Sequence, residues 1–141
     1  MNRVLIVAGG SISSDVIDKV PSWDYVIAAD GGIKFCEKLD IVPDMLVGDF
    51  DSATDIDKAA YEGKGVKIHT YVPEKDLTDT HIAVYKALEL SPREILIIGA
   101  TGRRMDHTLA NIGMLQFIDK SGIVGTIIDE QLAIDIQNAA V

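Results

Sequence analysis

Six short apolar runs recur along the chain, and most of them are followed at once by a glycine or an aspartate. They occupy residues 4–8, 25–29, 45–47, 66–71, 95–98 and 124–128. Most of these runs are continuously apolar rather than alternating, which is typical of strands buried on both faces of a parallel sheet. The pattern therefore predicts about six strands that are mainly parallel.

Amphipathic segments, whose apolar residues have helical spacing, lie between the predicted strands. They occupy residues 12–20, 32–39, 54–62, 78–90 and 106–120. Proline or glycine closely follows most of their ends, as expected where helices stop. This alternation predicts an α/β fold: a Rossmann-like three-layer sandwich with a mainly parallel sheet of about six strands flanked by helices.

Composition and charge narrow the class of protein. Hydrophobic residues make up 48% and charged residues 25% of the 141 residues, which indicates a soluble globular protein. The net charge is −9, so we expect no nucleic-acid partner. The single cysteine, Cys36, excludes an internal disulfide framework and a multi-cysteine zinc site. No apolar run approaches transmembrane length, so we expect a cytoplasmic protein without a membrane partner.

Aspartates follow several of the predicted strands. Because the carboxyl ends of parallel strands share one edge of a sheet, we expect six acids there: Asp30, Asp49, Asp51, Asp76, Asp79 and Asp106. Crowded carboxylates repel one another, and a hard cation such as Mg²⁺ relieves the repulsion. A single loop aspartate is more often a turn or cap residue. The pair Asp49 and Asp51, with Asp30 and Asp79 at the ends of other strands, favours a metal site instead.

The segment of residues 99–104 is the best candidate for a phosphate contact. Its small residues let backbone amides approach an anion, and Arg104 offers a bidentate fork. Other glycine pairs are more simply turns, and the chain has neither a P-loop nor a full dinucleotide-binding fingerprint. Cys36 and Trp23 are interpreted as packing residues. Clustered aspartates with Lys75 and Arg104 indicate metal-assisted phosphoryl or nucleotidyl transfer.

Four motifs together resemble the catalytic domain of thiamine pyrophosphokinases. They are Asp30-Gly31-Gly32, Gly48-Asp49-Phe50-Asp51-Ser52, Lys75-Asp76-Leu77-Thr78-Asp79 and Gly102-Arg103-Arg104-Met105-Asp106-His107-Thr108-Leu109-Ala110-Asn111. The resemblance covers nearly the whole chain, and the motifs have the order that they have in that family. It implies an ATP-dependent pyrophosphotransferase that converts thiamine to thiamine diphosphate and releases AMP.

The resemblance also implies roles for individual residues. Mg²⁺ would be held by Asp49, Asp51 and Asp79, with Asp30 as a close or water-mediated partner. The catalytic set would be these three residues with Lys75 and Arg104, which neutralise phosphate charge, and Asp106. ATP, as co-substrate, and thiamine would be bound by Ser11, Asp30, Gly31, Ser52, Asp76, Thr78, Thr101, Gly102, His107 and Asn111. A rim aspartate would serve as general base.

Two departures from the family pattern concern Arg103 and the end of the chain. Arg103 stands where the family usually has a small residue, and it would either contact phosphate or point to solvent. Family members continue into a C-terminal all-β domain that helps form a homodimer and supplies an aromatic wall to the thiamine pocket. We expect residues 1–130 to form the ATP- and Mg²⁺-binding catalytic domain. Residues 131–141 would then be the start of an absent β domain or a disordered tail, with a strand at 132–136 left without partners.

Two alternative functions stay open at this point. The same loops would serve a pyrophosphokinase for another heterocyclic alcohol, such as a pterin, because they handle ATP and Mg²⁺ rather than the acceptor. Alternatively, a chain without the complete thiamine pocket would be a non-catalytic module that binds a magnesium–nucleotide complex. The truncated chain would then have impaired activity or none.

Overall fold

Six parallel strands form most of the sheet in the computed structural model, which describes residues 1–10, 14–29, 31–48, 58–70, 79–100, 105–129 and 133–135. The strands are β1 (Arg3–Val7), β2 (Tyr25–Ala29), β3 (Met45–Gly48), β4 (Lys67–Thr70), β5 (Glu94–Ile98), β6 (Val124–Ile128) and β7 (Ala133–Asp135). The helices are the 3₁₀-helix η1 (Ser14–Lys19), α1 (Gly32–Lys38), α2 (Lys58–Gly63), α3 (Asp79–Glu89) and α4 (Met105–Lys120). The predicted α/β fold is thus confirmed.

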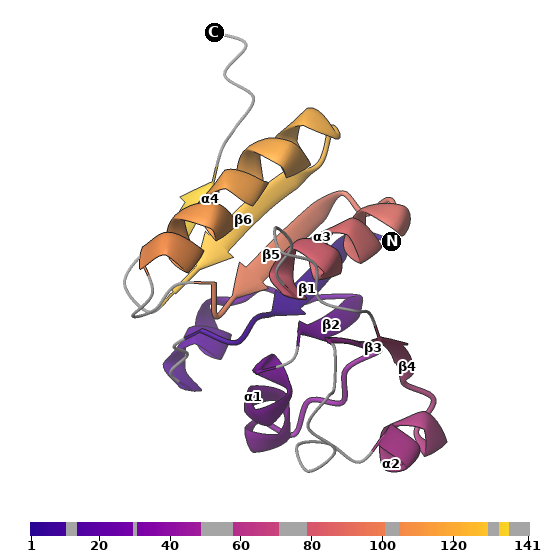
Figure 1. The fold of residues 1–141 in the computed structure, drawn as a ribbon. Coiled ribbons are helices and arrows are strands. Elements are labelled where there is room, and N and C mark those ends of the chain that lie inside the picture. Colours follow the sequence, from indigo (N-terminus) through magenta and orange to yellow (C-terminus); the bar gives the residue numbers. More distant parts are fainter. Residues whose placement is uncertain are drawn as a thin grey trace, which may run out of the picture.

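The order of the strands shows where the chain changes direction across the sheet. That order is β4-β3-β2-β1-β5-β6-β7, with β1 to β6 parallel and β7 antiparallel to β6. The chain builds outward from β1 to β4 and then returns to the other side of β1 with β5 and β6 (Figure 1). The switch point therefore lies between β1 and β5, where ligands bind in doubly wound folds.

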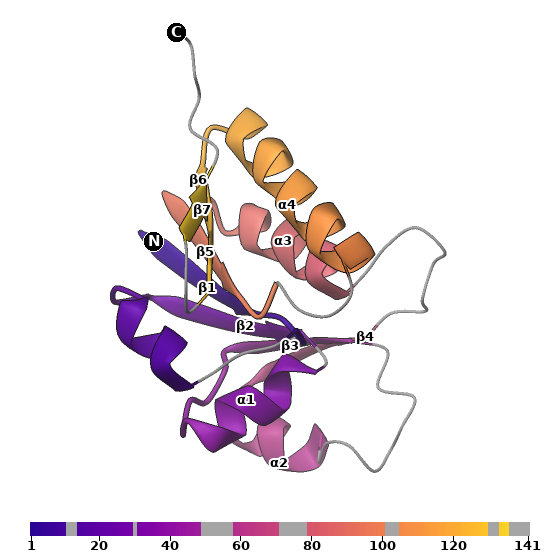
Figure 2. The ribbon, with the colours of Figure 1, turned by 90° about the vertical axis from the view of Figure 1, so that its left-hand side faces the viewer.

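The helices cover both faces of the sheet, which explains why its strands are continuously apolar. Figure 2 shows α3 and α4 on one face and α1 and α2 on the other. Ile6 and Ile97 point into the core beneath α3 and α4, whereas their neighbours Leu5 and Leu96 point toward α1, and all four are 0–1% exposed. The central strands thus bury both faces, as predicted from the sequence, whereas the edge strand β4 is only partly covered.

Two residues that the sequence indicated as packing residues do pack in the core. Cys36 is fully buried in α1, and Trp23 packs at the edge of the same cluster, as predicted. A Cβ added to Gly125 in β6 would lie 3.0–3.2 Å from side-chain atoms of Ile118 in α4. Gly125 therefore lets α4 lie close to β6, because a larger residue would push Ile118 away.

The two shortest helices are described only in part of their predicted ranges. The described part of the segment predicted as a helix over 12–20 contains the 3₁₀-helix η1, and the described part of the segment predicted over 54–62 is helical from Lys58. Residues 11–13 and 49–57 lie outside the described ranges. The bounds of α1, α3 and α4 agree with the prediction to within one residue at each end.

The chain end corrects one expectation. We expected a strand at 132–136 without partners, but Ala133–Asp135 form β7 and pair antiparallel with β6, with Ile127 opposite Ile134. The expectation was wrong because β6 would have an unpaired edge without β7. The antiparallel strand β7 covers that edge. The proposed division into residues 1–130 and 131–141 stays a prediction.

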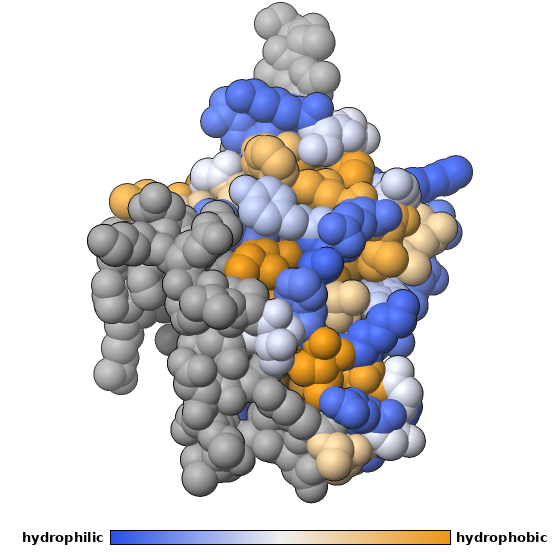
Figure 3. Space-filling model, turned by 45° about the vertical axis from the view of Figure 1, so that its right-hand side comes forward, coloured by the Kyte–Doolittle hydropathy of each residue, from blue (hydrophilic) through white to orange (hydrophobic). Residues whose placement is uncertain are grey.

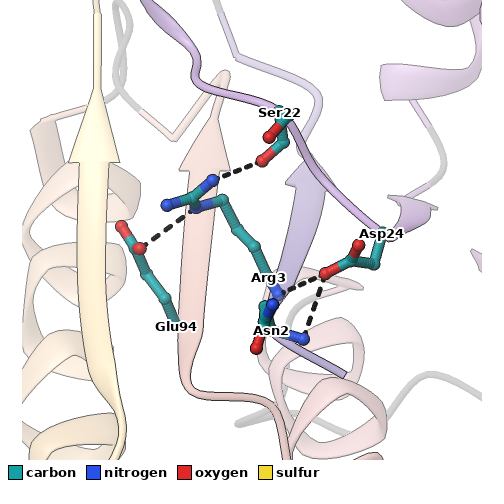
Figure 4. A network of polar contacts seen from close by, with 5 residues as sticks. All are labelled: Asn2, Arg3, Ser22, Asp24 and Glu94. Atoms are coloured by element: carbon teal, nitrogen blue, oxygen red, sulfur yellow. Dashed lines mark hydrogen bonds and ion pairs between the residues drawn. The ribbon is translucent and has the colours of Figure 1, made fainter.

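A network of polar contacts fastens the amino-terminal edge of the sheet (Figure 4). The Asp24 carboxylate accepts hydrogen bonds from the backbone N–H groups of Asn2 and Arg3, at 3.0 and 2.9 Å. Arg3 pairs with Glu94 at 3.0 Å through Nε and donates to the carbonyl of Ser22. The two backbone hydrogen bonds, that of Arg3 first, lower the pKa of Asp24. β1, β5 and the turn before β2 are thereby tied together.

The surface carries scattered apolar side chains. Figure 3 shows apolar patches separated by hydrophilic residues on one face. The exposed large apolar residues include Leu109 and Phe117 on α4 and Tyr85 on α3, whose ring meets that of Phe117 edge to face at 5.4 Å. Within the described ranges, none of the helices has the length and apolar character needed to cross a membrane.

Candidate functional site

The ends of the six parallel strands and the starts of the helices that follow them define the carboxyl edge of the sheet. Val7 pairs with Ala28 and Ile98, and Ala29 pairs with Val47, so the central strands end nearly level with one another. The helices α3 and α4 follow β4 and β5 and run back toward the opposite edge, so both begin at the carboxyl edge. Their N-termini carry partial positive charge, which favours anions there.

Most of the predicted site residues lie outside the described part of the chain. These are Ser11, Asp30, Asp49, Asp51, Ser52, Lys75, Asp76, Thr78, Thr101, Gly102 and Arg104, and Arg103 is among them too. Asp30 and Asp49 are next in the sequence after β2 and β3. Their assignments stay predictions, and the described strands show only that the segments leading to them converge on one edge.

Five predicted site residues fall within described elements. Asp79 is the first residue of α3, and Asp106 and His107 lie in the first turn of α4; for these three only the backbone is described. Gly31 immediately precedes α1, and Asn111 lies in the second turn of α4. The topology thus places the start of α3 and the start of α4 at the edge to which β2 and β3 lead.

Close backbone contact joins the ends of β1 and β2. A Cβ on Gly9 would lie 3.2 Å from the Cα of Gly31, and one on Gly31 would lie 3.1 Å from the Cα of Gly9. A Cβ on Gly32 would lie only 2.1 Å from the carbonyl oxygen of Val7, which no side chain permits. The sequence pattern predicts turns at these glycines and does not show this packing role. The signal that was available is a glycine pair after each of two neighbouring strands.

Asn111 makes a buried hydrogen bond behind the loop that follows β5. Its side chain is 7% exposed, and its Nδ2 donates to the carbonyl oxygen of Ala100 at 3.0 Å. Next to Ala100, Gly99 has a left-handed backbone with φ of 74°. The described contact of this amide is therefore with the protein backbone, and its predicted contact with substrate stays untested.

The remaining titratable groups near the core suit packing rather than chemistry. Burial raises the pKa of the Cys36 thiol to about 12, so it is not a nucleophile near neutral pH. Burial lowers the pKa of His81, and both His69 and His81 are half-buried. In the described ranges, no three His, Cys, Asp or Glu residues gather closely enough to hold a metal ion. The predicted metal ligands after the strands stay predictions.

Comparison with known proteins gives a consistent result. Residues 18–124 match the family described as thiamin pyrophosphokinase, catalytic domain. The chain is 36% identical to thiamine pyrophosphokinase of Bacillus subtilis (strain 168) over 133 residues, which are 93% of this chain and 62% of the relative. It is 30% identical to thiamine pyrophosphokinase 2 of Oryza sativa subsp. japonica over 89 residues, 59% of this chain and 33% of that protein.

Solved structures agree in fold. The crystal structure of the Bacillus subtilis thiamine pyrophosphokinase superposes with a TM-score of 0.77 and 32% identity, covering 94% of this chain and 62% of the other. A thiamin pyrophosphokinase family protein from Enterococcus faecalis gives a TM-score of 0.72 at 32% identity, covering 95% and 64%. The chain thus spans less than two-thirds of the length of these relatives.

Proposed function

The chain belongs to the thiamin pyrophosphokinase family, and from that membership we propose that it transfers the β,γ-pyrophosphoryl group of ATP to the hydroxyl of thiamine. The products are thiamine diphosphate and AMP. The observation that carries the proposal is the family match over residues 18–124, because that range includes every predicted catalytic residue from Asp49 to Asp106. The converging strand ends support it, since they lead to a single edge.

The reaction requires one displacement at phosphorus. The thiamine hydroxyl attacks the β-phosphorus of ATP in line, the bond from that phosphorus to the bridging oxygen of AMP breaks, and AMP leaves. In such transfers the protein acts mainly by positioning and charge neutralisation. We assign the phosphate contacts to Lys75 and Arg104, and the proton of the hydroxyl to an aspartate of the same edge.

The donor set fits a hard divalent cation. Asp30 and Asp49 directly follow neighbouring parallel strands, Asp51 comes two residues later, and Asp79 begins a helix that packs on the same sheet. Carboxylate oxygens are the ligands that Mg²⁺ prefers, and it leaves places for substrate phosphates. Asp49, Asp51 and Asp79, with Asp30 nearby, would hold it. When bound, the cation neutralises charge on the transferring group.

The proposal extends to assembly and location. It includes a homodimer in the longer family member and action in the cytoplasm, as the resemblance implies. A single, fully buried cysteine suits a reducing compartment. Both features go beyond the family match, and each is measurable separately by light scattering and by fractionation of the cells that express the protein.

An acceptor panel tests the proposed activity. The chain is incubated with Mg²⁺ and ATP, and then with thiamine, with a pterin alcohol or with no acceptor, and AMP is quantified. We expect AMP and thiamine diphosphate to form only with thiamine. AMP formed with the pterin alcohol but not with thiamine would transfer the assignment to another pyrophosphokinase. Binding of Mg²⁺–ATP without any AMP would indicate the non-catalytic module.

A further inference from the structure

The loops that follow β1 and β5 are joined by hydrogen bonds beyond both strand ends. The N–H of Ala8 donates to the carbonyl of Ile98 at 2.8 Å, and the N–H of Gly10 donates to that of Gly99 at 2.7 Å. These bonds lie at the switch point of the sheet. These bonds join residues 8–10 to residues 98–99 in one backbone framework. The framework leads directly to Ser11 and closely to Thr101, two predicted nucleotide contacts.

This framework continues on both sides. Toward β2, Gly9 packs directly on Gly31. Toward α4, the side-chain amide of Asn111 donates to the carbonyl of Ala100, and both residues are buried, at 7% and 3% exposed. A buried carbonyl that loses its donor incurs a desolvation cost, so this bond strongly favours one position of the loop backbone.

The helix that carries Asn111 is itself firmly held. Leu115 and Ile118, one and two turns later in α4, are fully buried in the core, and Gly125 allows the close approach of Ile118 to β6. Asn111 thus links a rigid helix to a loop backbone. Its amide is neutral, so it provides a donor without placing a negative charge beside an edge where phosphates are proposed to bind.

We propose that Asn111 is a positioning residue for the nucleotide site. Through the carbonyl of Ala100 it holds the loop after β5, and through the Gly10–Gly99 bond it also holds the loop after β1. This inference rests on the proposed function for its ligand, a magnesium–nucleotide complex. In this proposal Asn111 acts on the nucleotide through the backbone of the two loops and does not touch the substrate.

Asn111→Asp tests the inference, because it keeps the shape of the side chain but removes its N–H donor. Ile118→Val is the matched control: it weakens packing of the same helix without touching Ala100. Two quantities are measured on the full chain of 141 residues. Calorimetry gives the affinity for Mg²⁺–ATP, and NMR gives the hydrogen-exchange rate of the Gly10 amide relative to that of Leu96. A urea titration of each variant shows whether the two are equally destabilised.

For Asn111→Asp we expect at least a tenfold loss of Mg²⁺–ATP affinity and at least tenfold faster relative exchange at Gly10. For Ile118→Val we expect less than a twofold change in both. Unchanged affinity, or lost affinity with unchanged exchange at Gly10, would overturn the proposal; the second result would indicate direct contact with the nucleotide or repulsion of its phosphates by the new carboxylate. If Asn111→Asp does not fold, Asn111→Ser, whose hydroxyl is too short to reach Ala100, takes its place with the same expectations.

Failure of the proposed function gives a different result. The unmutated chain would then form no AMP with thiamine, and if the nucleotide itself is not its ligand it would bind no Mg²⁺–ATP. In that case the exchange rate at Gly10 decides by itself whether Asn111 holds the two loops: faster exchange in Asn111→Asp supports the inference, and an unchanged rate overturns it.

Discussion

The two edges of the sheet are held together by different means. At the amino edge, charged side chains make the contacts: Asp24 accepts hydrogen bonds from two backbone N–H groups, and Arg3 pairs with Glu94. At the carboxyl edge, the described contacts are mainly backbone to backbone, through Gly9, Gly31 and Gly99. The side-chain amide of Asn111 and the ammonium of Lys19 each add a hydrogen bond to a backbone carbonyl there. Charged side chains therefore fasten the edge remote from the proposed site.

The largest expected effect concerns the proposed metal ligands. Asp51→Ala removes a carboxylate from the predicted Mg²⁺ site, so we expect a loss on the order of 100-fold or more in thiamine-dependent AMP release, while stability hardly changes. The measurement is initial rate together with a urea titration. Asp24→Ala, at the opposite edge, is the control and should keep its activity. Full activity of Asp51→Ala would remove the basis for placing the metal at the carboxyl edge.

The next effect concerns glycine packing. Gly32→Ala would place a Cβ 2.1 Å from the carbonyl oxygen of Val7, so α1 must move away from β1. We expect a loss of about 3 kcal/mol in the free energy of unfolding, from urea denaturation.

Gly113→Ala is the matched control for that substitution. In the helix interior of α4, a Cβ at Gly113 meets nothing within 4 Å, so alanine should stabilise the protein by up to about 1 kcal/mol. Equal effects of the two substitutions would show that close contact at Gly32 is not what holds the carboxyl edge.

A smaller effect is expected where α2 meets α1. The hydroxyl of Tyr61 donates to Glu37 at 2.7 Å, and burial, followed by this bond, raises the pKa of Tyr61. Tyr61→Phe should cost about 1 kcal/mol in the free energy of unfolding, because the ring stays packed and only the hydrogen bond is lost. Urea denaturation measures this. A loss as large as that of Gly32→Ala would mean that this one side-chain hydrogen bond matters as much as the glycine packing at the carboxyl edge.

The smallest effect is a pH dependence at the amino edge. The pKa of Asp24 is lowered in the folded state, so its ionised form stabilises the fold above the ordinary pKa near 4. That contribution is lost as the pH falls through the folded pKa. We expect Asp24→Asn to be less stable than the unmutated chain at pH 6, and the difference to shrink at pH 3. Thermal unfolding at both values measures it, and a difference independent of pH would contradict the assigned cause.

Local pattern was sufficient to predict most of the fold. Continuous apolar runs marked the strands because both faces of the sheet are covered, as Leu5 and Ile6 show by packing in opposite layers. The six-residue η1 was predicted as an α-helix because a short amphipathic segment does not distinguish the two helix types. The pairing of β7 with β6 depends on contacts between strands, which the alternation of residues 131–136 does not specify.

The sequence predicted which residues belong to the site better than it predicted what those residues contact. The motifs after the strands identified Gly31 and Asn111, but they did not show that Gly31 packs on Gly9 or that Asn111 bonds to Ala100. The contact of Gly31 with Gly9 follows from strand order, which apolar runs alone do not determine. The contact of Asn111 with Ala100 spans 11 residues and depends on how α4 packs after β5. The roles of the acids that follow β2 and β3 remain predictions to be tested by substitution.

An NMR titration of the ¹⁵N-labelled chain with Mg²⁺–ATP tests the central claim most directly, because amides of both edges are observed in one experiment. We predict that the resonances of Gly10, Gly31 and Gly99 shift in a saturable, Mg²⁺-dependent way while those of Arg3, Asp24 and Glu94 stay in place. Shifts confined to the amino edge, or none at either edge at saturating nucleotide, would contradict the account.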